Sequence, residues 1–328
     1  MKIALLTSGG DAPGMNAAIR AVVRCGTERG IEMAGIGRGF NGLIEGDIRR
    51  LDNRAVGGII ERGGTILHSA RSKAFLTPEG QEKALMRIDQ HGIDGLIVIG
   101  GNGSLRGARW LEENGVPTVG IPASIDNDIP RTAMSIGVDS ALNTVVEALN
   151  RIRDTAIAHD RAFVIEVMGR RSGYIALMGG LAGGAEVILL PETSKTIGDV
   201  VEEVCAGVRR GKRHSIIVVA EGFVPSDLDE ASPSAGRVLT DALERDGTVE
   251  TRLTILGHLQ RGGSPTAFDR VLACRFAEAA VRWLAEGRHG VYTGLRNDEI
   301  VPAPFDALEE TCANVDLRLL RLAQTVAH

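Results

Sequence analysis

The chain has 328 residues, a formal net charge of −5, 42 glycines and 44% hydrophobic residues, and only 3% of its residues are aromatic. A chain of this length can form more than one hydrophobic core, so we expect two domains, and its hydrophobic content excludes a disordered protein. The excess of acidic residues gives no support to a broad nucleic-acid-binding surface. The composition favours a glycine-rich α/β protein.

The cysteines show neither a CxxC pair nor the spacing of metal ligands, so reduced thiols are expected at Cys25, Cys205, Cys274 and Cys312. The N-terminal apolar run Ile3–Leu6 is too short for a signal peptide. No stretch approaches the ~20 apolar residues that span a bilayer. We therefore expect a cytoplasmic protein that binds neither membranes nor nucleic acid.

The chain begins with a predicted strand, glycine turn and helix. Ile3–Leu6 forms the strand, Thr7–Gly14 is the turn, and a helix follows from about Met15 to Arg29. Such a turn can present backbone N–H groups and a helix N-terminus to phosphate. Arg20 and Arg24 share one face of this helix, which is either a solvated basic edge or an anion site.

Two glycine-rich segments, 35–42 and 56–71, are expected to be irregular. The second ends at Arg71 and is typical of a loop that carries an arginine to a binding site. A helix is expected over Pro78–His91, directly before the central strand of the sheet.

A second strand, glycine turn and helix follows. Leu96–Ile99 is the kind of apolar run that forms a strand buried on both faces. Gly100 and Gly101 allow a sharp turn and a close approach to a ligand. Ser104 is the expected N-cap of the next helix.

The strand Thr118–Ile121 leads to a pair of carboxylates, Asp126 and Asp128. Parallel strands deliver this pair and the Gly101 turn to the same edge of a sheet, where ligands bind in open α/β proteins. One carboxylate could take a proton from a hydroxyl group while the other orients that hydroxyl or helps to hold a metal. Without the neighbouring glycine turns, the same residues would more readily be interpreted as a helix cap.

The second half of the chain also alternates between helices and strands. A helix is expected from about Ser140 to Arg153, and the polar segment 222–249 is expected to be a surface loop. Strands are expected over Phe163–Val167, Ala185–Leu190, Ser215–Ala220 and Thr254–Leu256. The fold class is therefore α/β.

Several arginines lie in or beside loops that follow strands or glycine turns: Arg71, Arg161, Arg170, Arg252 and Arg261. A guanidinium group is permanently charged and forms bidentate hydrogen bonds, which suits phosphate. Glu221 and His258 lie at the ends of predicted strands and suit polar recognition of a sugar. Taken singly, each of these residues is more often a surface or core residue.

Seven motifs follow one another along the chain: TSGGDAPGMNAAIR, IERGGTILHSAR, VIGGNGS, IDND, EVMGRRSGY, LAGGAE and LGHLQRGGSP. Through these motifs, in this order, the chain resembles the bacterial 6-phosphofructokinases from residue 3 to about residue 275. The resemblance implies two doubly wound, mainly parallel-sheet domains facing each other across an active-site cleft. It also implies phosphoryl transfer from ATP to O1 of fructose 6-phosphate in glycolysis, with Mg²⁺. The expected assembly is an allosteric homotetramer with active sites shared between subunits.

The same resemblance implies a domain division and a role for each site residue. Residues 1–138 and 258–305 would bind nucleotide, and residues 139–257 and 306–328 would bind sugar phosphate. Asp126 is the implied base. The implied catalytic set is Asp126, Asp128, Ser124, Arg71, Arg170 and Gly10. The implied ATP set is Gly10, Phe40, Arg71, Ser72, Gly101, Asn102, Gly103 and Ser104, with Asn102 as the metal position.

The implied substrate set is Ser124, Asp126, Asp128, Arg161, Met168, Gly169, Arg170, Glu221, Arg252, His258 and Arg261. Within this set, Arg161 and Arg252 are expected to reach in from a neighbouring subunit. The implied effector set is Arg20, Arg24, Arg153, Glu186, Arg210 and Lys212. An arginine of the family's effector site is Asn53 here, so a charge-assisted contact to a diphosphate is missing. Regulation by a nucleotide diphosphate or phosphoenolpyruvate, regulation by another ligand, and no regulation all stay open.

Two positions bear on the phosphoryl donor. Pyrophosphate-using members of the family usually have an acidic residue where this chain has Gly103 and a lysine where it has Ala123. Gly103 leaves room for the α-phosphate and nucleoside of ATP, and Ala123 offers no cation to pyrophosphate. ATP is the expected donor.

Asn102 occupies a position where ATP-using members typically have an aspartate close to the metal. An amide keeps an oxygen but removes a negative charge, so we expect a raised magnesium requirement that Asn102→Asp would lower.

Two alternatives follow from the sequence: a pyrophosphate-dependent phosphofructokinase, and a catalytically weak regulatory paralogue that binds nucleotide or sugar phosphate. The intact Asp126 and Asp128 weigh against the paralogue. Nothing in the sequence excludes a related sugar phosphate, such as tagatose 6-phosphate.

Overall fold

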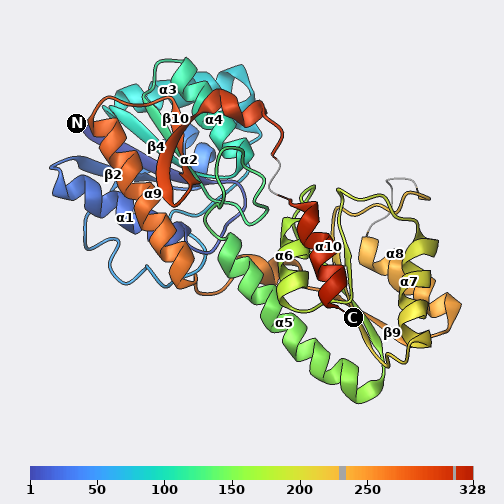
Figure 1. Cartoon of the computed structure of the whole chain (residues 1–328). Coiled ribbons are helices and arrows are strands. Elements are labelled where there is room, and N and C mark those ends of the chain that lie inside the picture. The colour runs from blue at the N-terminus through green and yellow to red at the C-terminus, as the bar shows by residue number, and fades with distance from the viewer. Residues whose placement is uncertain (229–233, 313–314, 328) are drawn as a thin grey trace. The chain divides into compact units, whose positions relative to one another are not determined.

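The computed structural model describes residues 1–228, 234–312 and 315–327, and the chain forms two compact units (Figure 1). Unit 1 comprises Met1–Ser140 and Arg261–Cys312, and unit 2 comprises Ala141–Gln260 and Ala313–His328. Residues 306–312 therefore belong to unit 1 and not, as expected, to the second domain. The reason is that Phe305 and Leu308 are buried in the hydrophobic core of unit 1.

Unit 1 contains a seven-stranded sheet in the order β11-β10-β5-β4-β1-β2-β3. Its strands are β1 Lys2–Ser8, β2 Glu32–Ile36, β3 Ile48–Arg50, β4 Gly95–Gly100, β5 Thr118–Pro122, β10 Val291–Arg296 and β11 Glu299–Pro304. The five inner strands are parallel, and the edge strands β3 and β11 run antiparallel to their neighbours.

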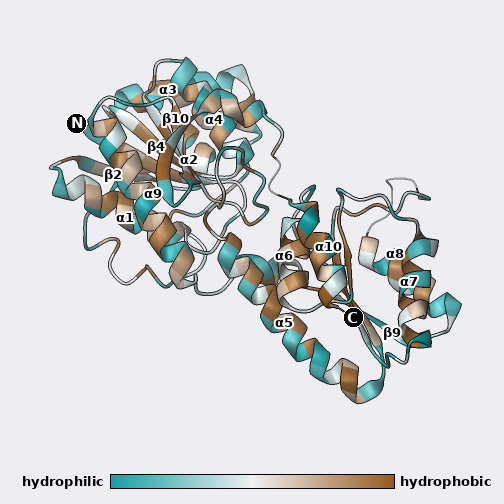
Figure 2. Ribbon diagram, viewed as in Figure 1, coloured by the Kyte–Doolittle hydropathy of each residue, from teal (hydrophilic) through white to brown (hydrophobic). Residues whose placement is uncertain are grey.

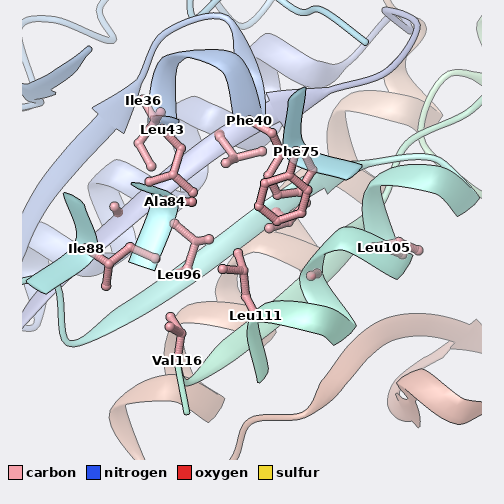
Figure 3. Packing of buried hydrophobic residues seen from close by; sticks show 14 of the residues in the cluster. Ile36, Phe40, Leu43, Phe75, Ala84, Ile88, Leu96, Leu105, Leu111 and Val116 are labelled. Atoms are coloured by element: carbon pink, nitrogen blue, oxygen red, sulfur yellow. The ribbon is translucent and has the colours of Figure 1, made fainter. Parts of the chain in front are cut away.

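Helices cover both faces of this sheet: α1 Met15–Glu28, α2 Gly39–Glu45, α3 Pro78–Gln90, α4 Asn102–Glu113 and α9 Ala267–Ala285. On one face, α2, α3 and α4 bury Leu43, Ile88 and Leu105 together with strand residues such as Leu96 (Figure 3). On the other face, α1 and α9 pack against each other (Figure 1). Two short 3₁₀ helices are η1 Ala74–Leu76 and η3 Phe305–Glu309.

Unit 2 contains a fully parallel four-stranded sheet in the order β7-β8-β6-β9. Its strands are β6 Ala162–Val167, β7 Val187–Leu189, β8 Ser215–Ala220 and β9 Thr251–Ile255. Its helices are α5 Val138–His159, which begins in unit 1, α6 Tyr174–Ala182, α7 Ile197–Arg209, α8 Ala235–Asp246 and α10 Leu317–Val326, and the 3₁₀ helix η2 spans Gly257–Arg261. Helices α7 and α8 cover one face through Val204 and Leu239. Helix α6 covers the other face, where Gly180 lies against Ile188 and Val218.

The α/β class with parallel sheets is confirmed, but three local expectations were wrong. Segment 35–42 holds the end of β2 and the start of α2. Segment 222–249 contains α8, because Ser234 caps that helix and Leu239 and Leu243 are buried one turn apart; residues 229–233 of this segment lie outside the described residues. Strand β9 begins at Thr251, three residues earlier than predicted.

Helices α1 and α9 show both brown and teal segments in Figure 2, as expected for helices with one buried and one exposed face. Across the described ranges, no helix combines the length and the apolar character needed to span a membrane.

Candidate active site

The carboxyl ends of β1, β4 and β5 lie in a row in unit 1. Ser8 pairs with Gly100, and Gly100 pairs with Pro122. The chain therefore leaves the sheet at one edge in three neighbouring segments. These segments carry Gly10, the start of α4 and the Asp126–Asp128 turn, so the structure brings together the parts that the sequence pattern predicted at this edge.

The turn that carries Asp126 is held by its own side chains. Asp126 is 1% exposed, and its backbone N–H donates to Oγ of Ser124 at 3.3 Å. Asn127 adopts a positive φ of 47°. Its Nδ2 donates to the carbonyl of Ala133 at 3.0 Å, and its Oδ1 accepts from the N–H of Ser135 at 3.2 Å. Asp128, in contrast, is partly exposed.

Asn102 is the first residue of α4 and connects this helix to the turn. Its Nδ2 donates to the backbone carbonyl of Asp128 at 3.1 Å. Its Oδ1 is buried and has no hydrogen-bond partner among the described residues. Gly101, the N-cap of α4, lies beside Ser124, since a β-carbon at Gly101 would be 3.6 Å from Cβ of Ser124.

The remaining residues predicted for ATP lie around α4. Gly103 is exposed, and a β-carbon there would meet no atom within 4 Å. Ser104 is not the N-cap that we expected, because the N-cap is Gly101 and the helix begins at Asn102. Ser104 lies inside the first turn and is 4% exposed. Phe40 is also buried, and its ring stacks on Phe75 at 4.2 Å (Figure 3). Oγ of Ser72 accepts from the N–H of Phe75 at 3.1 Å and so fixes the start of η1.

The loop that ends at Arg71 is anchored to β1 and α1. Asn16 donates to the carbonyls of Arg62 and Gly63 and accepts from the N–H of Ile66 at 2.8 Å. Arg71 itself is exposed. A buried side chain of α1 thus defines the path of a loop about fifty residues away in sequence.

Arg261 lies in unit 1 next to the first glycine turn. It is 8% exposed, and its Nη1 donates to the carbonyl of Asp11 at 3.0 Å. Its guanidinium group is therefore held against Gly10 and Asp11. This is a fixed positive charge at the sheet edge that also carries the Asp126 turn.

Unit 2 holds a second predicted group, on the loop that follows β6. Oε1 of Glu221 accepts from the N–H of Gly169 at 3.2 Å and from the N–H of Arg170 at 2.8 Å. Gly169 has a φ of 145°, a conformation that side-chain-bearing residues rarely adopt. The N–H of Met168 donates to Oε1 of Gln260 at 3.3 Å. Glu221 thus fixes the loop, while Arg170 and His258 are exposed.

Arg161 and Arg252 converge on one carboxylate of unit 2. Nε of Arg161 donates to Oε2 of Glu250 at 2.8 Å, and Nη2 of Arg252 donates to Oε1 of the same residue. The hydrogen bond from Arg161 is the main cause that lowers the pKa of Glu250 below its usual value. Sequence reasoning missed Glu250. The sequence feature that could have identified it is its position two residues before Arg252, where the chain enters an extended strand.

Comparison with known proteins decides the family. The family model described as phosphofructokinase matches residues 2–284. The chain belongs to the phosphofructokinase family. It is 50% identical to the ATP-dependent 6-phosphofructokinase of Brevibacillus brevis and 52% identical to that of Halalkalibacterium halodurans, in each case over 99% of both chains. The phosphofructokinase structure from Saccharomyces cerevisiae superposes with a TM-score of 0.86 at 37% identity, covering 94% of this chain and 45% of the yeast chain.

A divalent cation fits the chemistry of this phosphofructokinase-family site. No group of three or more His, Cys, Asp or Glu residues that could hold a metal occurs in the part of the chain that the structure describes. Mg²⁺, however, usually keeps several waters and binds one or two protein oxygens together with substrate phosphates. The buried Oδ1 of Asn102, beside the turn of Asp126 and Asp128, could serve as such an oxygen.

The effector residues expected in a phosphofructokinase fall into both units. In unit 2, Arg153 lies 4.0 Å from Glu186 and donates to the carbonyls of Gly183 and Gly184. Nζ of Lys212 donates to the carbonyl of Ala327 at 2.6 Å. Arg210 is exposed at the end of α7, and Arg20 and Arg24 lie on α1 of unit 1.

Proposed function

We propose that this chain is an ATP-dependent 6-phosphofructokinase that transfers a phosphoryl group from ATP to O1 of fructose 6-phosphate, a step of glycolysis. The observation that carries the proposal is the clamped Asp126–Asp128 turn, which leaves the sheet beside the start of α4 and the Gly10 turn. Relatives that are about half identical over nearly the whole chain are named for this activity.

The residues of unit 1 supply the base and the nucleotide contacts. Asp126 takes the proton from the O1 hydroxyl group, and Asp128 and Ser124 orient the reacting groups. The N-terminal turn of α4 and the Gly10 turn bind the ATP phosphates through backbone N–H groups. The open space beside Gly103 supports ATP as the donor, because a larger side chain there would narrow the path of the nucleotide.

The arginines supply positive charge to the phosphates. Phosphoryl transfer depends mainly on positioning and on stabilising charge on the transferred group, and guanidinium groups do both. Arg71 and Arg261 act from unit 1, and Arg170, with Met168, Gly169, Glu221 and His258, holds the sugar phosphate from unit 2. In this proposal unit 1, with Met1–Ser140 and Arg261–Cys312, binds the nucleotide, and unit 2, with Ala141–Gln260 and Ala313–His328, binds the sugar phosphate.

In this proposal the protein is a cytoplasmic homotetramer, in which Arg161 and Arg252 complete the active site of a neighbouring subunit. Mg²⁺ would be held by Oδ1 of Asn102 and the phosphate oxygens of ATP. When bound, it neutralises negative charge on the transferred group. The effector residues would bind an anionic ligand, because arginine and lysine predominate among them.

A coupled assay with fructose 6-phosphate tests the proposal, with ATP and pyrophosphate run in parallel over a magnesium titration. Turnover with ATP and Mg²⁺ is the expected result. Turnover with pyrophosphate alone would refute the argument from Gly103. No turnover with either donor, in a protein that still binds fructose 6-phosphate by calorimetry, would instead identify a regulatory paralogue.

A further inference from the structure

One side chain links the start of α4 to the turn that carries the proposed base. Asn102 donates from Nδ2 to the backbone carbonyl of Asp128 at 3.1 Å, across 26 residues of sequence. Because that partner is a carbonyl oxygen, it must face the amide nitrogen, so the orientation of the side chain is defined. Oδ1 therefore points away from the carbonyl, and it is the atom that is buried without a partner in the described structure.

The turn is restrained from two directions. On one side, Asn127 bonds to Ala133 and Ser135, and Oγ of Ser135 donates to the carbonyl of Ser124 at 2.7 Å. On the other side, the hydrogen bond from Asn102 reaches the residue that ends the turn. Asp126 lies between these two attachments, so the direction of its carboxylate depends on both.

We propose that Asn102 is a positioning residue for Asp126, and that its amide nitrogen is the reason this chain carries asparagine at the start of α4. The inference rests on the proposed function for its catalytic consequence. The Nδ2 group fixes the turn, and Oδ1 stays available as a neutral ligand. Asn102 thus performs two tasks, and a carboxylate could perform only one of them.

The chemistry of the two side chains explains the difference. Ionised aspartate has the same shape as asparagine but only accepts hydrogen bonds. In Asn102→Asp, a carboxylate oxygen would face the carbonyl oxygen of Asp128, so a hydrogen bond would be replaced by repulsion. The helix dipole acts in the opposite direction, because a negative charge in the first turn of α4 is favourable. A lower stability of Asn102→Asp would therefore show that the repulsion dominates, and a higher stability that the helix dipole dominates.

Asn102→Asp and Asn102→Ala test the proposal. Both remove the donor, but only the first adds a charge and only the second removes the acceptor. We expect the thermal unfolding temperature of the ligand-free protein to fall in both variants, by about 2–4 °C, the shift expected when a domain of this size loses one hydrogen bond. Amide hydrogen exchange at Asp126 and Ser135 should become faster, because both amides are bonded within the turn.

Activity separates positioning from general stability. At saturating Mg²⁺ and ATP, we expect kcat of both variants to fall between about 10-fold and 100-fold, while KM for fructose 6-phosphate changes less than about twofold. Saturating Mg²⁺ removes any difference in metal affinity from this comparison. Asn114→Asp is the matched control. Asn114 ends the same helix and also donates from Nδ2 to a backbone carbonyl, that of Trp110 at 2.8 Å, so its variant should lose stability and keep kcat.

An unchanged or higher unfolding temperature for Asn102→Asp, together with an unchanged or higher kcat at saturating Mg²⁺, would overturn the proposal. Asn102 would then be a weak metal ligand and nothing more. Loss of kcat in Asn114→Asp equal to that in Asn102→Asp would also overturn it, because the effect would then follow from helix stability alone. If the unmodified protein had no phosphofructokinase activity, the proposed function would fail, while ligand-free unfolding and hydrogen exchange would still decide whether Asn102 holds the turn.

Discussion

The guanidinium group of Arg261 lies so close to Gly10 that a β-carbon on Gly10 would be 2.8 Å from Nη1 of the arginine. Arg261 is almost fully buried, and it also donates a hydrogen bond to the carbonyl of Asp11. The glycine turn after β1 therefore has a second task besides its proposed role in binding a phosphate. It makes room for a buried positive charge at the carboxyl edge of the sheet.

Gly10→Ala should displace this guanidinium group. We expect kcat/KM to fall at least 10-fold, and the free energy of unfolding to fall by only about 0.5–1.5 kcal/mol, because the flexible end of Arg261 can move and loses its hydrogen bond to Asp11. Steady-state kinetics and urea unfolding measure the two effects. Gly198→Ala is a suitable control, because its β-carbon on α7 would meet only Oγ1 of Thr196, at 3.7 Å, and both quantities should stay unchanged or rise slightly. Full activity in Gly10→Ala would show that Arg261 can move without consequence.

Gly103 offers a test of the donor site. A β-carbon there meets no protein atom, and alanine is favoured over glycine inside a helix by up to about 1 kcal/mol. We therefore expect Gly103→Ala to stabilise the protein slightly, and both Gly103→Ala and Gly103→Asp to raise KM for ATP, with the larger rise for the charged residue. Kinetics at varied ATP and fixed fructose 6-phosphate would measure this. An unchanged KM for ATP in Gly103→Asp would mean that the nucleotide does not pass this position.

Asp126→Asn should remove the proposed general base. General-base catalysis is typically worth about 10²- to 10⁴-fold, so we expect kcat to fall within that range while KM for fructose 6-phosphate changes little. Circular dichroism and thermal unfolding would verify that the fold is retained. Asp154→Asn, on the exposed surface of α5, provides the control and should leave kcat unchanged. A loss of less than fivefold in Asp126→Asn would assign the base to another residue.

Glu250 pairs with both Arg161 and Arg252, so a substrate phosphate that binds these arginines must compete with its carboxylate. We expect Glu250→Gln to lower KM for fructose 6-phosphate about two- to fivefold, since exposed charges contribute modestly. A higher KM would instead mean that Glu250 holds the arginines in their binding geometry.

The same variant has a pH signature. The pKa of Glu250 is lower in the folded protein than its ordinary value of 4.5, so its ion pairs contribute stability above that pH. The contribution is lost as the pH falls through the lower folded value. The difference in unfolding free energy between the unmodified protein and Glu250→Gln should therefore be constant at neutral pH and shrink below about pH 4.5. Urea unfolding at a series of pH values would measure it.

The local sequence pattern determined several strands and turns of the fold and the family of the protein. The apolar runs at Leu96–Ile99 and Ser215–Ala220 are the strands β4 and β8, because a strand buried on both faces needs a continuous run of such residues. The glycine turns mark the ends of β1 and β4, and the ordered motifs identified the family that the comparisons confirm. The pairing of Asp126 and Asp128 on one turn was also visible, since only Asn127 separates them.

Only the tertiary structure decided how distant residues act on one another. Helix α8 was missed because its buried stripe is short and the surrounding segment is polar, so packing against β6 and β8 stabilises it more than its own pattern suggests. The bond from Asn102 to Asp128 and the contact of Arg261 with Gly10 join residues 26 and 251 positions apart. Such contacts depend on the register of the strands and on the packing distances between side chains, to within a few tenths of an ångström. Neither quantity can be inferred from the identity of the two residues alone.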